Sequence, residues 1–218
     1  DSLKNKIFNH NENNEPLWLW HYYNIKANYS EWQKNYENAI ENYRNCLSIP
    51  ALGPFEYGAT FVNMAIAYRF LYINNPNDQT NIEKSIQLGD IGVRLKESVG
   101  DRDEMPVVLH NQALNLLYKI LYVSICFDDL QKCIDTTNKG ISILQNTGSC
   151  KKLGVLLIEN IISKELLKKN SDEMKQKLKN EYKNLDENDS KQLLEIYKQF
   201  VKSNKITKIN FLEEKIQL

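Results

Sequence analysis

Apolar residues recur at helical spacing along most of this chain, and the clearest run lies between Tyr36 and Pro50. Its apolar positions follow one another at intervals of three and four residues: Tyr36, Ala39, Ile40, Tyr43, Cys46 and Leu47. This spacing places them on one face of a helix. Pro50, Gly53 and Pro54 then predict the end of that helix and a turn.

The same periodicity predicts further helices on both sides of this run. The expected helices are about Leu17–Tyr29, Trp32–Ile49, Phe55–Tyr72, Ile82–Glu97, Asp103–Cys126, Asp128–Leu144, Lys151–Lys169, Ser171–Leu185 and Asp189–Lys202. The polar residues 1–15 predict an N-terminal arm, and Ile206–Leu218 fits a strand or, as we expect, a terminal helix. Apolar runs fall short of the roughly 20 residues that span a bilayer. The pattern therefore predicts an all-α fold without a membrane segment.

An internal repeat with an offset of 48 residues links two of the expected helix pairs. The matched positions are Asn63 with Asn111, Ala65 with Ala113, Ile82 with Leu130, Ser85 with Cys133, Ile86 with Ile134, Gly92 with Gly140, and Gly100 with Gly148. The matches keep register across two helices and the loop between them, which predicts a duplicated helix pair. Small residues at these positions suit close helix crossings.

Two kinds of segment resemble units of the tetratricopeptide repeat (TPR) family. Tyr36–Pro50 is similar to the second helix of a TPR unit, with an aromatic before a small Ala, then an aromatic, a small residue, Leu and a closing Pro. The runs 63–68 (Asn-Met-Ala-Ile-Ala-Tyr) and 110–115 (His-Asn-Gln-Ala-Leu-Asn) resemble the first helix. Gly100-Asp101-Arg102 is similar to a linker of TPR arrays in regulatory ATPases. The resemblance covers residues 17–148, although the second and third pairs carry extra residues before their second helices.

This resemblance implies a TPR-like α-solenoid of about three helix pairs plus C-terminal capping helices. The expected division is an N-terminal arm over 1–15, repeats over 16–148 and a helical cap over 149–218. In TPR arrays the first helix of each pair lines a concave groove, where Asn side chains bind the backbone of a peptide because amides both donate and accept hydrogen bonds. The residues that the resemblance places at such a groove are Asn63, Asn111, Asn28, Arg69, Lys26 and His110.

Composition and motifs argue against most other classes of function. Lys and Arg together number 28, as do Asp and Glu, so the formal net charge is zero and predicts no nucleic-acid partner. The four cysteines form no CxxC pair, and we expect buried, reduced thiols in a cytoplasmic protein, with one disulfide left open. The sequence contains no HExxH, P-loop, GxGxxG or GxSxG motif. We therefore expect no cofactor, no metal and no catalysis.

The sequence thus predicts a cytoplasmic scaffold or regulatory module that binds a protein or peptide in its concave groove. One alternative is a helical immunity or antitoxin-type protein that binds a single partner. Another is a helical enzyme with a site near Asp103 and His110. The aromatic run Trp18–Tyr23 is expected to pack into the core on one side and to meet a neighbouring helix or a partner on the other.

Overall fold

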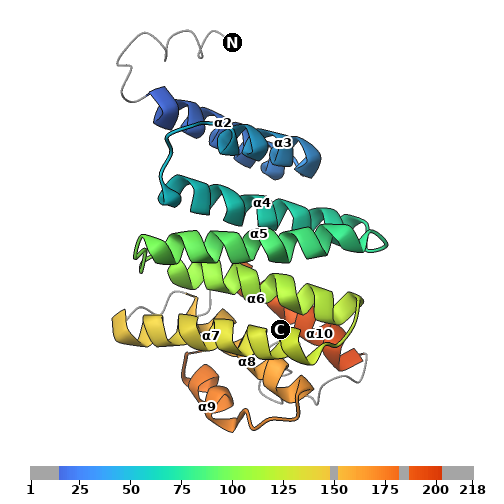
Figure 1. Cartoon of the computed structure of the whole chain (residues 1–218). Coiled ribbons are helices and arrows are strands. Elements are labelled where there is room, and N and C mark those ends of the chain that lie inside the picture. The colour runs from blue at the N-terminus through green and yellow to red at the C-terminus, as the bar shows by residue number, and fades with distance from the viewer. Residues whose placement is uncertain (1–14, 148–151, 182–186, 203–218) are drawn as a thin grey trace. The chain divides into compact units, whose positions relative to one another are not determined.

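The computed structural model describes residues 15–147, 152–181 and 187–202, and every regular element in these ranges is a helix (Figure 1). The helices are α2 (Glu15–Trp32), α3 (Tyr36–Leu47), α4 (Pro54–Asn74), α5 (Gln79–Ser98), α6 (Met105–Tyr122), α7 (Phe127–Thr147), α8 (Leu153–Leu166), α9 (Asp172–Glu181) and α10 (Glu187–Lys202). The all-α prediction is confirmed. The expectations for residues 1–14 and for Ile206–Leu218 lie outside the described residues. None of the described helices combines the length and hydropathy required to cross a bilayer.

Two helix boundaries lie four residues from the positions that periodicity predicted, and most of the others lie within three residues. The helix expected to begin at Trp32 begins at Tyr36, because α2 continues to Trp32 and a turn follows in which Lys34 adopts φ = 60°. Asn35 caps α3, its side-chain oxygen accepting from the backbone N–H of Asn38 at 3.2 Å. The helix expected to reach Cys126 ends at Tyr122, and no proline or glycine marks that end in the sequence.

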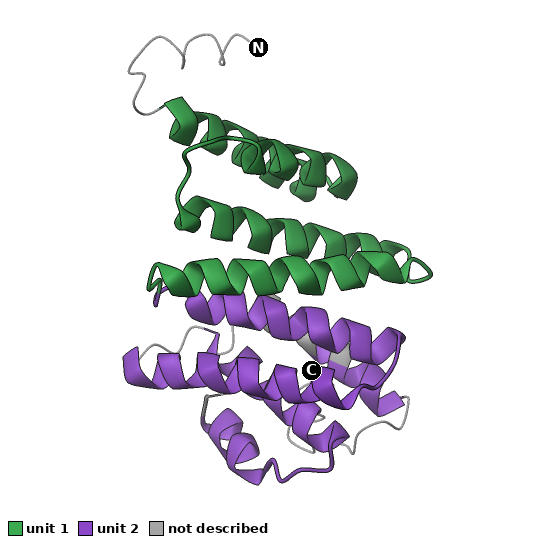
Figure 2. Cartoon of the chain, in the orientation of Figure 1, with its two compact units in different colours: residues 1–101 green, residues 102–218 purple. Residues whose placement is uncertain are grey.

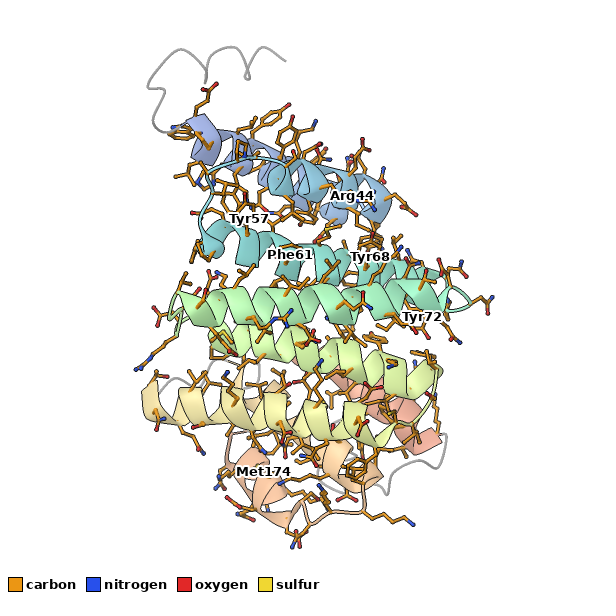
Figure 3. The ribbon with its side chains drawn as sticks, viewed as in Figure 1. Arg44, Tyr57, Phe61, Tyr68, Tyr72 and Met174 are labelled. Carbon is orange, nitrogen blue, oxygen red and sulfur yellow. The ribbon has the colours of Figure 1, made fainter. Side chains whose placement is uncertain are left out.

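The chain forms two compact units, residues 1–101 and 102–218 (Figure 2). In unit 1, α2 and α3 form one hairpin, α4 and α5 form a second, and the two hairpins pack mainly through α3 and α4. In unit 2, α6 and α7 form a hairpin, α8 packs against both of them, and α10 contacts α6 and α8. Helix α9 packs on α8 and buries Met174 (Figure 3).

Small residues at the centre of unit 1 allow its helices to approach closely. Ala27 of α2, Ala39 of α3 and Ala67 of α4 are fully buried in one apolar cluster with Ile40, Tyr43, Met64 and Tyr68. A second cluster surrounds Trp20, whose indole N–H donates to the Thr60 hydroxyl at 2.8 Å. The bond satisfies the one polar atom of a buried indole, so it fixes the orientation of α2 on α4.

The hairpins α4–α5 and α6–α7 repeat at the 48-residue offset found in the sequence. Helices α4 and α6 end at Asn74 and Tyr122, and helices α5 and α7 begin at Gln79 and Phe127. The same interhelical contact recurs in both. The Ser85 hydroxyl donates to the Ala65 carbonyl at 2.7 Å, and the Cys133 thiol donates to the Ala113 carbonyl at 3.8 Å. The predicted duplication is therefore present in the contacts within each hairpin.

The end of unit 1 explains the Gly-Asp-Arg segment. Gly100 adopts φ = 66°, a left-handed conformation that favours glycine. The turn brings Asp101 within 2.9 Å of the buried Lys96 ammonium, which also lies 3.7 Å from the centre of the Phe55 ring. The carboxylate and the ring together compensate the charge that Lys96 buries.

Two glycines related by the repeat should respond differently to substitution. A Cβ at Gly92 would lie 2.6 Å from Val62 Cγ2, 3.1 Å from the Val62 backbone nitrogen and 3.2 Å from the Gly58 carbonyl. The three atoms nearest to a Cβ at Gly140 all belong to the side chain of Leu156, and the nearest is Cδ1 at 2.8 Å. Because backbone atoms cannot rotate away, we expect Gly92→Ala to destabilise the protein by about 1–3 kcal/mol. We expect Gly140→Ala to change stability by less than about 1 kcal/mol, since the helix propensity of Ala offsets the contact.

Urea unfolding of both variants, followed by circular dichroism, measures this difference. Equal destabilisation by the two substitutions would show that α4 and α5 do not approach one another closely at Gly92.

Candidate functional site

A row of amide side chains lies where α2 and α4 meet in unit 1. Asn63 of α4, one of the residues singled out in the sequence, donates from Nδ2 to Asn24 Oδ1 of α2 at 3.5 Å. This is the long limit for a hydrogen bond, so the pair is weak. Asn24 and Asn63 are half-buried and Asn28 is exposed. The three amides are thus at least partly accessible to a ligand that both donates and accepts hydrogen bonds.

Sequence reasoning missed Asn24, although a signal for it exists. Asn24 and Asn28 are four residues apart on α2, so they share one face of that helix. The pairing of Asn24 with Asn63 across 39 residues is a tertiary contact that no local pattern contains.

Asn28 belongs to a hydrogen-bonded group with Tyr43 and Glu31. The buried Tyr43 hydroxyl lies 2.8 Å from Asn28 Oδ1 and 3.0 Å from Glu31 Oε1. A hydroxyl has one proton to donate, so it cannot donate to both oxygens at once. Burial raises the pKa of Glu31 to about 7, against the opposing effects of the Tyr43 hydrogen bond and the Arg69 charge. The protonation of Glu31 therefore changes near neutral pH, next to the exposed amide of Asn28.

The two basic residues singled out in unit 1 lie in different environments. Arg69 is buried, sits 5.7 Å from the centre of the Phe70 ring and acts electrostatically on Glu31. Lys26 is exposed, and its ammonium lies 5.4 Å from the centre of the Tyr22 ring. Arg69 therefore supports the interior beneath the amide row, whereas Lys26 offers a positive charge to solvent.

Aromatic and basic side chains hold α3 and α4 together beside this row. The Arg44 guanidinium donates to the Tyr68 hydroxyl at 3.0 Å, in the layer between the two helices (Figure 3). The rings of Tyr36 and Phe70 stack with centroids 5.1 Å apart. Lys84 of α5 reaches within 5.4 Å of the Tyr68 ring. These contacts fix the position of α4, and hence of Asn63.

In unit 2 the corresponding residues face the interior or their own helix. His110 is buried, and its Nδ1 lies 2.7 Å from Oε1 of the fully buried Glu159 on α8. Asn111 is half-buried and donates to the Val107 carbonyl one turn earlier at 3.0 Å. Helix α6 is buried along most of its length, with α7, α8 and α10 packed around it. His110 is therefore withdrawn from the surface, whereas Asn111 is half-buried like Asn63 but donates within its own helix.

The buried cysteines are held as neutral thiols. Burial raises the pKa of Cys46 to about 12, and burial followed by the charge of Glu159 also raises the pKa of Cys133. Cys126 is half-buried, and all three thiols are free of disulfides, whereas Cys150 lies outside the described residues. The expectation of buried, reduced thiols is confirmed for Cys46 and Cys133. A protonated thiol is a poor nucleophile and a poor metal ligand.

The part of the chain that the structure describes includes one small surface cleft. A cleft of about 250 Å³ lies between the start of α2 and the α3–α4 loop; it is lined by Pro16, Leu17, Ala51, Leu52, Gly53 and Glu56. Small-molecule sites usually measure about 300–1,000 Å³. Among the described residues, no group of three or more His, Cys, Asp or Glu side chains is arranged to hold a metal ion. Asp103 is exposed in the loop before α6.

A scan against protein-family models gives no match, and neither do searches of curated proteins and of solved structures. The amides of α2 and α4 are partly accessible and are paired across two helices by a long hydrogen bond.

Proposed function

We propose that this chain is a non-catalytic, TPR-like protein-binding scaffold that binds an extended peptide segment along α2 and α4. The observation that carries the proposal is the row formed by Asn24, Asn28 and Asn63. An extended peptide presents N–H and C=O groups alternately along its length, and amide side chains can pair with both. The Asn24–Asn63 bond is weak, so a ligand can replace it at little cost.

The internal duplication supports the scaffold part of the proposal. Within unit 1 the hairpin α4–α5 packs on α3, and within unit 2 the hairpin α6–α7 packs on α8. In helical repeat proteins, each hairpin likewise buries one face against an adjacent element. On this proposal the helices after α7 act as a cap, because α8 and α10 cover α6. A cytoplasmic location accords with the free thiols of Cys46 and Cys133.

The charges near the row favour a neutral or acidic ligand segment. Lys26 is exposed but lies about 160° around α2 from both Asn24 and Asn28, so it does not belong to the row. The buried Arg69 adds positive potential below the surface, and Glu31 is neutral for part of the time at pH 7. His110 and Arg69 are buried and Lys26 lies on the other side of α2, so the proposed contact surface consists of Asn24, Asn28 and Asn63.

Selection of random peptides displayed on phage against the immobilised protein tests the proposal. The selected peptides, labelled with a fluorophore, are titrated with wild type and with Asn24→Ala and Asn63→Ala variants in anisotropy measurements. We expect each substitution to weaken binding about tenfold, since each removes a hydrogen bond worth about 1 kcal/mol or slightly more.

Asn77→Ala, in the exposed loop before α5, is the matched control and should bind as wild type does. Asn111→Ala in unit 2 should also leave the affinity unchanged. Selected peptides that bind all four variants equally would place the binding surface elsewhere and contradict the proposal.

A further inference from the structure

An exposed aromatic stripe runs along α2. The stripe consists of Trp18, Tyr22, Ile25, Tyr29 and Trp32, spaced by four, three, four and three residues; Tyr22 is half-buried and the other four are exposed. This spacing aligns side chains on one helix face, as in helices that pair with another helix. The exposed fractions are 52% for Trp18, 65% for Ile25, 57% for Tyr29 and 78% for Trp32.

The stripe lies on the face of α2 opposite the core of unit 1. Ala27 marks the buried face, and at 100° per residue Trp18 and Ile25 point almost directly away from it. The rings of Tyr29 and Trp32 stack with centroids 5.9 Å apart, and Lys26 lies over Tyr22. The side chains are thus ordered against one another before any partner binds, which lowers the entropic cost of association.

We propose that the stripe pairs with the stripe of a second copy of this chain, in a two-fold symmetric dimer with antiparallel α2 helices. The order of residue types, Trp-Tyr-Ile-Tyr-Trp, is the same in both directions around Ile25. Antiparallel pairing about Ile25 therefore sets Trp18 against Trp32 of the second copy, and Tyr22 against Tyr29. A two-fold interface needs such a self-complementary surface.

The charges at the ends of α2 agree with the antiparallel direction. Glu15 begins the helix and Lys34 follows it, both are exposed, and their midpoint falls within one residue of Ile25. Antiparallel pairing brings Glu15 of each copy close to Lys34 of the other. A parallel arrangement would set like charges side by side at both ends.

The area of the stripe is close to what a stable dimer requires. Aromatic side chains present about 150–250 Å² each, so the exposed parts of the stripe offer roughly 600 Å² per copy. A standard interface buries about 800 Å² per partner, so the residues that border the stripe would supply the remaining area. The preceding segment 1–14 is a poorer match, since its large apolar residues are Leu3, Ile7 and Phe8.

Sedimentation equilibrium of the full chain at up to about 100 μM tests the proposal, a range in which interfaces of this size associate. We expect wild type to reach twice the 25.5 kDa chain mass and Ile25→Glu to remain monomeric with an unchanged circular dichroism spectrum. Ile125→Glu is the matched control, because Ile125 is also half-exposed but lies in the α6–α7 loop of unit 2. It should dimerise as wild type does.

Cysteine crosslinking then tests the direction of pairing, in a background with Cys126→Ser and Cys150→Ser. Ile25→Cys lies at the proposed two-fold axis and should oxidise to a covalent dimer. Trp32→Cys should not, because its two copies would be about 20 Å apart along the helices. A monomeric wild type, a dimer that survives Ile25→Glu, or equal crosslinking at both positions would overturn the proposal. So would dimerisation that appears only after residues 1–14 are deleted, since the arm would then be the natural occupant of the stripe.

Discussion

Replacing His110 by Leu is expected to destabilise unit 2 by about 3–5 kcal/mol, the usual effect of breaking a buried ion pair or charge-assisted pair by removing one partner. His110 Nδ1 lies 2.7 Å from Oε1 of Glu159, and the Glu159 side chain is fully buried. Leu at position 110 would leave that carboxyl without its imidazole partner in an apolar region. The free energy of unfolding, measured with urea and circular dichroism, reports the loss.

A double-mutant cycle separates the pair from simple loss of packing. Glu159→Leu should also destabilise unit 2. The free energy of unfolding of the double variant His110→Leu/Glu159→Leu should fall by much less than the sum of the two single effects. Asn111→Leu is a matched control, because the Asn111 side chain donates to its own helix. This substitution should lower the free energy of unfolding by about 1 kcal/mol or less. Additive effects in the cycle would mean that the two side chains do not stabilise one another.

The pH dependence of stability should change when Glu31 is replaced by glutamine. The pKa of Glu31 is about 7 in the folded protein against 4.5 for the exposed group, so the folded state holds this proton more tightly. Its contribution to stability is fully present below pH 4.5 and is lost as the pH rises through 7. The loss amounts to about 3 kcal/mol at most, since each pKa unit corresponds to about 1.4 kcal/mol. The amide introduced by Glu31→Gln would stay neutral and keep a donor for Tyr43, so the variant should lose less stability between pH 5 and pH 8.

Urea unfolding of wild type and Glu31→Gln at pH 5 and pH 8 gives the change in the free energy of unfolding between these pH values. The difference between the two proteins reports Glu31, because the other carboxylates contribute equally to both. Glu37→Gln, an exposed position on α3, serves as the control and should follow wild type. The idea that Glu31 is held protonated by burial fails if Glu31→Gln retains the full pH dependence of wild type.

Peptides selected on the amide row should also bind with a pH dependence that Glu31→Gln removes, if Asn28 takes part in binding.

The helices and the repeat could be predicted from local patterns in the sequence. Periodic apolar residues such as Ile82, Ile86 and Leu130, Ile134 are a local property, since a helix brings residues three and four apart to one face. The offset of 48 residues located the hairpins α4–α5 and α6–α7, whose loops lie at equivalent positions. It also matched Ser85 with Cys133, and these residues make the same contact in both hairpins.

The environment of each polar residue depended on how the helices pack, which no local pattern contained. The sequence offered Asn63, His110 and Arg69 as equal candidates for ligand contact. Packing left Asn63 accessible beside Asn24 but buried His110 against Glu159, which is 49 residues away in the chain. Burial likewise moved the pKa of Glu31 towards neutrality. A residue's exposure and charge depend on which helices pack around it, and helices distant in sequence meet through side-chain fit that local periodicity does not encode.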